Sequence, residues 1–209
     1  RMFIPNGFEE KEWLDDDPTT GFSAGVYKKG DNVIISFTGT NEDLWKDFIK
    51  ANIPGGTGWG WGSEQICQAF ALVLRTIKKY ANAKLSFTGH SLGGGLASLM
   101  AVFFDKPAYT FDMAPFKNSA RNINIIMVLY KYMRDNDITN QDFENYVNSL
   151  YIDPVELYEY SRIYNKDRYR DEKIEKRIAD INFAIHESLK DRERNVEHWY
   201  TSGEILNTI

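Results

Sequence analysis

The chain has few of the residues that build disulfides and zinc sites. Its 209 residues include one cysteine, Cys67, and three histidines that lie far apart in the sequence. A single cysteine excludes an internal disulfide, so the fold does not depend on an oxidising compartment. Scattered histidines and one cysteine give no cluster with the spacing of zinc ligands. We therefore expect no metal and no other cofactor.

Long apolar runs and an excess of positive charge are also missing. No run approaches the roughly 20 residues that cross a bilayer, so we expect no transmembrane segment. We also expect no secretory signal peptide. The net charge of −5 speaks against nucleic-acid binding and against electrostatic docking on anionic membranes.

The most informative segment that is present is FTGHSLGGG, residues 87–95. It follows a short apolar run that is typical of a strand, and it precedes an apolar helical pattern over 96–104. A serine at the apex of a strand–turn–helix, in the pattern G-x-S-x-G, is the nucleophile elbow of α/β-hydrolases. Ser91 could instead be a helix cap, but a cap does not require the glycines on both sides.

The elbow predicts part of the chemistry. The turn lifts the Ser91 hydroxyl above the sheet and places the Leu92 backbone N–H at a helix start, where it can face a developing oxyanion. A serine hydroxyl is a weak nucleophile at neutral pH. It needs a histidine to take its proton and an acid to orient that histidine.

The order of the remaining elements predicts the fold class. Residues 22–28 and 33–37 read as a β-hairpin, a helix with one apolar face follows Ser63, and 108–112 is a further strand. Alternating strands and helices predict an α/β fold with a mainly parallel sheet and helices on both faces. With 43% hydrophobic residues, the length fits one domain over 1–209.

Residues 117–195 differ in character and read as a helical insertion. The segment is rich in Asn, Asp, Tyr, Lys and Arg, and apolar residues recur with helical spacing from Ile174 to Leu189. Such an insertion could form a lid over the site at the elbow, or it could complete an outer layer of helices.

A second motif carries a family resemblance. Residues 36–47 read SFTGT-x4-W-x-D, and the elbow follows about fifty residues later. This combination resembles the class 3 (fungal-type) lipases and their bacterial relatives, including lipase effectors of the type VI secretion system. The resemblance covers 21–116 and implies that the backbone N–H groups of Thr40 and Leu92 form the oxyanion hole. Thr38 stands where the family usually has arginine.

The acid and the base remain open between two assignments. The string TSGEIL resembles the family segment that carries the acid, which makes Glu204 the acid although the family more often has aspartate there. Chain order then places the base beyond Ile209, and the chain would be truncated. Alternatively His198 is the base, with Asp112 or Asp153 as the acid. Asp153 also fits a helix-capping box.

The functional expectation is a serine esterase that hydrolyses carboxylic esters of lipids, as a lipase or phospholipase A. The resemblance implies an antibacterial effector that enters target cells without a signal peptide and has a cognate immunity protein. Two alternatives remain: a thioesterase or acyl hydrolase acting on small substrates, and a non-catalytic binding module with a hydrolase fold.

Overall fold

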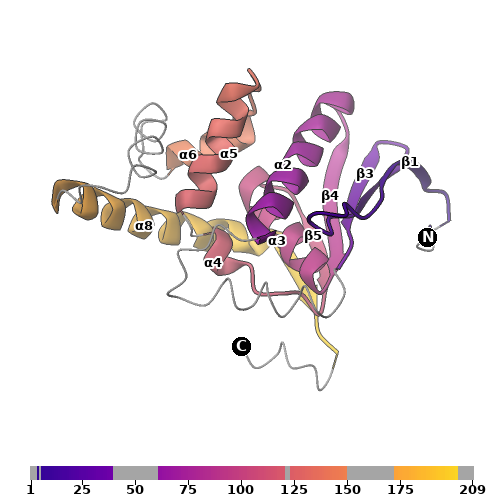
Figure 1. Cartoon of the computed structure of the whole chain (residues 1–209). Coiled ribbons are helices and arrows are strands. Elements are labelled where there is room, and N and C mark those ends of the chain that lie inside the picture. Colours follow the sequence, from indigo (N-terminus) through magenta and orange to yellow (C-terminus); the bar gives the residue numbers. More distant parts are fainter. Residues whose placement is uncertain (1–3, 5, 40–60, 121–122, 150–171, 202–209) are drawn as a thin grey trace. The chain divides into compact units, whose positions relative to one another are not determined.

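In the described part of the chain, six strands in sequence order form the sheet of the first of two units (Figure 1). The computed structural model describes residues 4, 6–39, 61–120, 123–149 and 172–201. The first unit comprises residues 1–116 and 195–209, and the second comprises 117–194. The strands are β1 (Glu9–Leu14), β2 (Ala24–Lys29), β3 (Asn32–Phe37), β4 (Lys84–His90), β5 (Ala108–Phe111) and β6 (Val196–Trp199).

The sheet is antiparallel at one side and parallel from β3 onward. β1, β2 and β3 pair antiparallel, whereas β4, β5 and β6 each pair parallel with the strand before them. A mostly parallel sheet with crossover helices confirms the predicted α/β class. The carboxyl ends of β3, β4 and β5 therefore meet at one edge of the sheet.

The predicted hairpin is confirmed in β2 and β3. Lys29 pairs with Asn32, which leaves a two-residue turn, and Gly30 in that turn has φ +54°. A positive φ at the first turn residue suits glycine and matches the twist of a tight hairpin.

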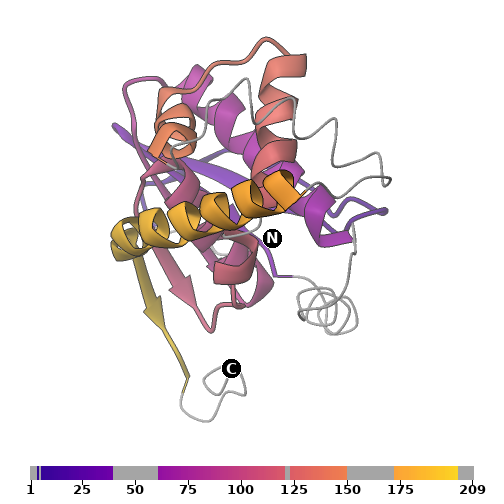
Figure 2. The ribbon, with the colours of Figure 1, turned by 90° about the vertical axis from the view of Figure 1, so that its left-hand side faces the viewer.

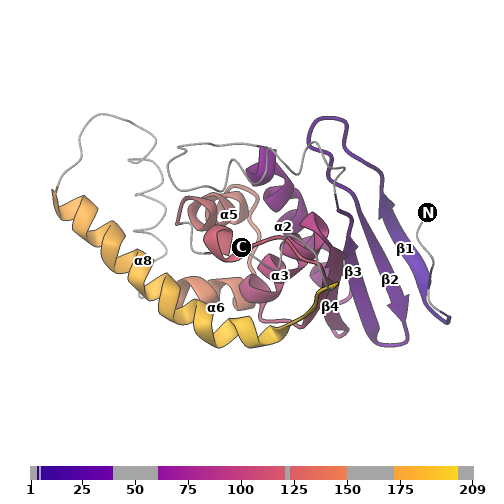
Figure 3. The same cartoon turned by 90° about the horizontal axis from the view of Figure 1, so that it is seen from below.

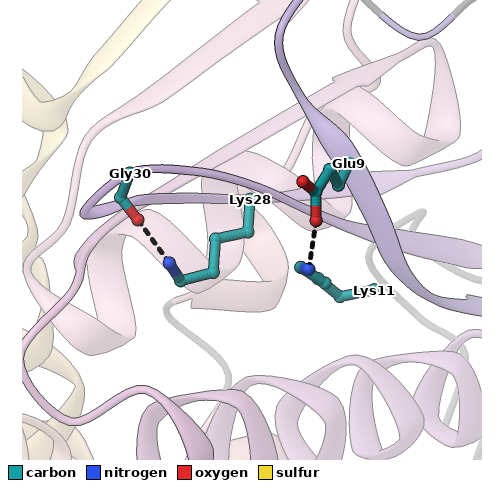
Figure 4. Close-up of polar contacts among 4 residues, drawn as sticks. All are labelled: Glu9, Lys11, Lys28 and Gly30. Atoms are coloured by element: carbon teal, nitrogen blue, oxygen red, sulfur yellow. Dashed lines mark hydrogen bonds and ion pairs between the residues drawn. The ribbon is translucent and has the colours of Figure 1, made fainter.

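Strand β1 was not expected from the sequence. Its segment EEKEWL is mostly charged, and charged side chains protect the open edge of a sheet from pairing with another chain. Figure 4 shows Lys11 paired with Glu9 on this strand, and Lys28 of β2 donating to the carbonyl oxygen of Gly30. The strand is held by its pairing with β2 and not by an apolar pattern of its own.

Helices α2 (Trp61–Lys79) and α3 (Leu92–Phe104) connect the parallel strands. Each crossover leads to the next strand in the same direction, so right-handed connections place both helices on one face. The two helices pack against each other and lie on the same side of the sheet (Figure 3). We expected helices on both faces of the sheet. In the described part of this unit, α2 and α3 cover one face.

The core lies between this face and the two helices. Every residue of α3 is buried. Aromatic pairs lie within each layer: the Phe37 and Phe87 ring centroids of β3 and β4 are 6.3 Å apart, and the Phe70 and Phe104 centroids of α2 and α3 are 5.1 Å apart. Because α3 is buried along its whole length, its packing fixes the position of its first residue, Leu92, relative to the sheet.

The opposite face carries exposed aromatic residues at its β5–β6 side. Trp199 stacks on Phe111 and Tyr109, with ring centroids 5.4 Å and 6.3 Å apart. Each of the three side chains remains more than two-fifths exposed.

The second unit is helical in its described residues. It contains α4 (Lys117–Ala120), α5 (Ile123–Asp135), α6 (Gln141–Ser149) and the long α8 (Glu172–Arg192), which Figure 2 shows as one continuous helix. Tyr146 is fully buried, donates to the carbonyl oxygen of Ala120 at 3.3 Å, and lies under the Arg192 guanidinium at 4.8 Å. Leu189 of the predicted apolar stripe is buried. That this unit acts as a lid stays a prediction.

Candidate active site

Ser91 occupies a sharp turn between a strand and a helix. β4 ends at His90, α3 begins at Leu92, and Ser91 between them has φ 54° and ψ −123°. A positive φ is strained for a residue with a side chain, and such strain persists only where the surrounding structure enforces it. This is the backbone conformation that the predicted elbow requires.

The flanking glycines leave no room for side chains. A Cβ atom on Gly89 would lie 2.3 Å from the Gly93 backbone, and one on Gly93 would lie 2.2 Å from the carbonyl oxygen of Phe37. Both distances are far below van der Waals contact. The two glycines therefore let β4, α3 and the end of β3 approach closely enough to form the turn.

The Ser91 side chain does not cap the helix. It lies at the N-cap position of α3 but makes no capping hydrogen bond, and the residue is half-buried. The hydroxyl is therefore not occupied by a structural role at the helix end. The Leu92 N–H, at the first helical position, is one of the amides that a helix leaves without an internal acceptor.

The backbone around Ser91 is fixed by β5 and by the segment after it. The Ser91 N–H donates to the carbonyl oxygen of Phe111 at 3.0 Å. The Ser91 carbonyl oxygen accepts from the Gly95 N–H at 3.1 Å and from the Ala114 N–H at 2.9 Å. These bonds orient the serine without using its hydroxyl.

The end of β3 lies directly beside the elbow. Phe37 pairs with Gly89, and a Cβ atom on Gly39 would lie 3.5 Å from the Ser91 Cβ atom. The segment expected to supply the second oxyanion donor is thus adjacent to the nucleophile. Thr40 itself lies outside the described residues. Among the described residues, the buried Thr38 hydroxyl has no hydrogen-bond partner. The family that the sequence resembles usually has arginine at this position.

Asp112 follows β5 at the same edge of the sheet. It is 8% exposed and has φ +42°. Its Oδ1 accepts from the Thr201 N–H at 2.5 Å, and its Oδ2 accepts from the Thr201 hydroxyl at 2.7 Å. These two bonds, and secondarily the nearby His90 at 3.8 Å, hold the pKa of the Asp112 carboxyl below its usual value. Sequence reasoning did not find the Thr201 contact.

His198 and Ser91 both lie in the described part of the chain, and the structure does not bring them into contact. His198 lies within β6 and shares a row of the sheet with Thr110 and Gly89. Two strand spacings, roughly 10 Å, separate β6 from β4. The exposed imidazole packs edge-on against Tyr200, with centroids 5.1 Å apart.

The other candidate acids and histidines are distributed as follows. Glu204 and Asp153 lie outside the described residues. His90 shares its row with Phe111 and Trp199 and keeps 66% of its side chain exposed. His186 lies on α8 in the second unit.

Two further features concern cofactors and membranes. No group of three or more His, Cys, Asp or Glu side chains in the described ranges could hold a metal ion. Within those ranges, no helix has the length and apolar character needed to cross a membrane.

Known proteins that resemble this chain are phospholipases and lipases. Residues 5–127 match a family model described as a phospholipase-like, Tle-like phospholipase domain. The extracellular phospholipase A1 of Serratia liquefaciens is 36% identical over 98 residues, covering 47% of this chain and 29% of that protein. The chain thus spans less than a third of that relative's length.

Two solved lipase structures are similar to part of the chain. A fungal lipase in an inhibitor complex is 18% identical with a TM-score of 0.40, over 51% of this chain and 49% of that chain. The native Rhizomucor miehei lipase propeptide complex is 19% identical with a TM-score of 0.36, over 51% and 42% of the two chains.

Proposed function

The chain belongs to the Tle-like phospholipase family, and from this premise we propose that it hydrolyses carboxylic esters of phospholipids with Ser91 as the nucleophile. The observation that carries the proposal is the Ser91 turn. Its strained backbone holds a half-buried serine whose side chain makes no capping hydrogen bond to α3. The serine lies beside the N-terminus of α3 and the end of β3.

The proposed reaction has two steps. Ser91 Oγ attacks the acyl carbonyl carbon while a base takes the hydroxyl proton. The tetrahedral intermediate then collapses, the ester C–O bond breaks, and the base returns the proton to the departing lysophospholipid oxygen. Water attacks the acyl-enzyme in the same way, releasing the fatty acid and restoring the serine hydroxyl.

Two backbone amides are proposed to stabilise the oxyanion. The Leu92 N–H comes from the start of α3, and the Thr40 N–H comes from the segment that follows Gly39 at the elbow. Each donor of this kind contributes roughly 3–4 kcal/mol to transition-state stabilisation. The closeness of Gly39 to Ser91 supports this pairing.

For the proton relay we propose Glu204 as the acid with a histidine beyond Ile209 as the base. The position of His198 within β6 supports this choice over the alternative, because β5 separates that strand from β4. In the alternative assignment, His198 acts with Asp112 or Asp153. The antibacterial role and the immunity protein implied by the resemblance stay predictions.

Hydrolysis of defined lipids tests the proposal. Vesicles of phosphatidylcholine are incubated with the full-length protein and with its Ser91→Ala variant, and released fatty acid and lysophospholipid are quantified by mass spectrometry. Ser86→Ala, on the same strand, is the matched control. We expect equimolar products from the wild type and the control, and none above background from Ser91→Ala.

Two results would contradict this function. Activity that survives in Ser91→Ala would remove Ser91 from the chemistry. Turnover of a short-chain acyl thioester, with none of phosphatidylcholine or a long-chain ester, would instead support the small-substrate acyl hydrolase.

A further inference from the structure

Asp112 adopts a left-handed backbone conformation, which is uncommon for residues other than glycine, although aspartate takes it more readily than most. Its φ of +42° lies in the left-handed region, directly after β5, and the residue is buried. Non-glycine residues in this region are strained, and such strain gathers at functional sites. A side chain at this position needs contacts that offset the strain.

Those contacts reach the last residue of β6 and the chain segment that follows it. Both carboxylate oxygens accept hydrogen bonds from Thr201, one from its N–H at 2.5 Å and one from its hydroxyl at 2.7 Å. The Asp112 N–H also donates to the carbonyl oxygen of Trp199 at 2.8 Å. Three bonds from one residue thus fix the segment 199–201 where the chain leaves the sheet.

The same corner holds the nucleophile. The residue before Asp112, Phe111, accepts the Ser91 N–H, and Ala114, two residues after Asp112, donates to the Ser91 carbonyl oxygen. His90, which precedes Ser91, brings its Nε2 to 3.8 Å from Asp112 Oδ2. The elbow and Thr201 are therefore tied to a single short stretch of backbone.

We propose that Asp112 is a positioning residue that holds Thr201 beside the elbow, and so sets where the segment carrying Glu204 begins. The inference rests on the proposed function, because Glu204 is the proposed acid and lies three residues after Thr201. In this role the Asp112 carboxylate acts as a double hydrogen-bond acceptor and not as the partner of the catalytic histidine.

Variants of Asp112 separate the two roles. Asp112→Gly removes both side-chain bonds and relieves the positive φ, and we expect kcat to fall about 10–100-fold with little change in KM. Asp112→Asn keeps the geometry, because its Oδ1 accepts the Thr201 N–H and its Nδ2 donates to the Thr201 hydroxyl oxygen. We expect it to rescue kcat relative to Asp112→Gly. A fall of about 10⁴-fold in Asp112→Asn would identify a triad acid and overturn the proposal.

Thr201 variants test the other side of the contact. Thr201→Val keeps the side-chain shape but loses the hydroxyl, and Thr201→Ser keeps the hydroxyl. We expect kcat to fall in the first variant and to recover in the second. Equal kcat values in both variants would contradict the proposal. The two Thr201 variants also test the contact if Asp112→Gly does not fold.

Asp105 provides a matched control. It also has a positive φ, of 51°, and it accepts a hydrogen bond from Asn195, just before β6. Asp105 follows α3 and precedes β5, so it lies at the opposite edge of the sheet from Ser91. We expect Asp105→Gly to leave kcat at the wild-type value.

Amide hydrogen exchange gives a readout that does not depend on catalysis. We expect the Thr201 N–H to exchange faster in Asp112→Gly than in the wild type or Asp105→Gly. Unaltered exchange at Thr201 would overturn the proposed contact even if the protein is an active esterase. Protected exchange in a wild type that cleaves no ester would support the contact and refute the proposed function.

Discussion

Gly39 lies against Ser91: a Cβ atom on Gly39 would sit 3.5 Å from the Ser91 Cβ atom and 2.9 Å from the carbonyl oxygen of His90. The contact joins the ends of β3 and β4, which are adjacent parallel strands. It brings together two motifs that are separated in sequence by about fifty residues. The proposed oxyanion hole depends on this approach of the two backbones.

We expect Gly39→Ala to impair catalysis more than folding. The new methyl group would push the segment after β3 away from the elbow. The His90 carbonyl oxygen is a backbone atom and cannot move out of the way by a side-chain rotation. A displacement of about 1 Å lowers kcat by up to about 100-fold. Steady-state kinetics and the melting temperature measured together check this. Wild-type kcat in Gly39→Ala would contradict the proposed hole.

Substitution of Gly93 should destabilise the fold itself. An added Cβ atom would lie 2.2 Å from the Phe37 carbonyl oxygen, whereas at Gly95 the nearest atom is the Ala114 Cβ atom at 3.0 Å. We expect Gly93→Ala to lower the free energy of unfolding by about 3 kcal/mol or more, and Gly95→Ala by less. Denaturant unfolding monitored by circular dichroism measures both. Equal losses would contradict the tight packing at Gly93.

The elbow could be predicted from sequence because its requirements are local. The glycines around Ser91, the strand before them and the apolar helix after them are contiguous, so their pattern specifies the turn. β1 could not be predicted in this way. Its charged residues have no alternating apolar pattern, and the strand exists through its pairing with β2.

The Asp112–Thr201 contact also lies beyond sequence reasoning. The two residues are 89 positions apart, and only the parallel register of β5 with β6 brings them together. The sequence placed Asp112 at the end of a strand, which is confirmed. Its partner Thr201 follows a strand that comes after the helical unit in the sequence.

The same contact predicts a pH dependence of stability. The pKa of Asp112 is lowered in the folded protein by the Thr201 hydrogen bonds and by His90, relative to about 3.9 in the unfolded chain. Its contribution to stability is therefore complete above that unfolded pKa and is lost as the pH falls through the lower folded pKa.

Asp112→Asn removes this titration and serves as the reference. We expect the difference in the free energy of unfolding between wild type and Asp112→Asn to shrink as the pH falls from about 5 to about 2. Urea unfolding at a series of pH values measures the difference. A difference that stays constant or grows on acidification would refute the lowered pKa.

His198→Gln distinguishes the two assignments of the base. The residue lies on β6, with β5 between it and the strand that leads to Ser91. We therefore expect kcat to change by no more than a few-fold, whereas loss of a triad histidine lowers kcat by about 10⁶-fold. Ester hydrolysis by purified His198→Gln decides between them. A loss on the larger scale would make His198 the base.

Reaction with a fluorophosphonate probe tests the central claim most directly, because the probe forms a covalent bond only with an activated serine. Labelled protein is digested and the modified residue is located by mass spectrometry. In the full-length protein, we predict one adduct on Ser91 in the wild type and in Ser86→Ala, and no adduct in Ser91→Ala. An unlabelled wild type, or a label that persists in Ser91→Ala, would contradict the assignment of Ser91 as the nucleophile.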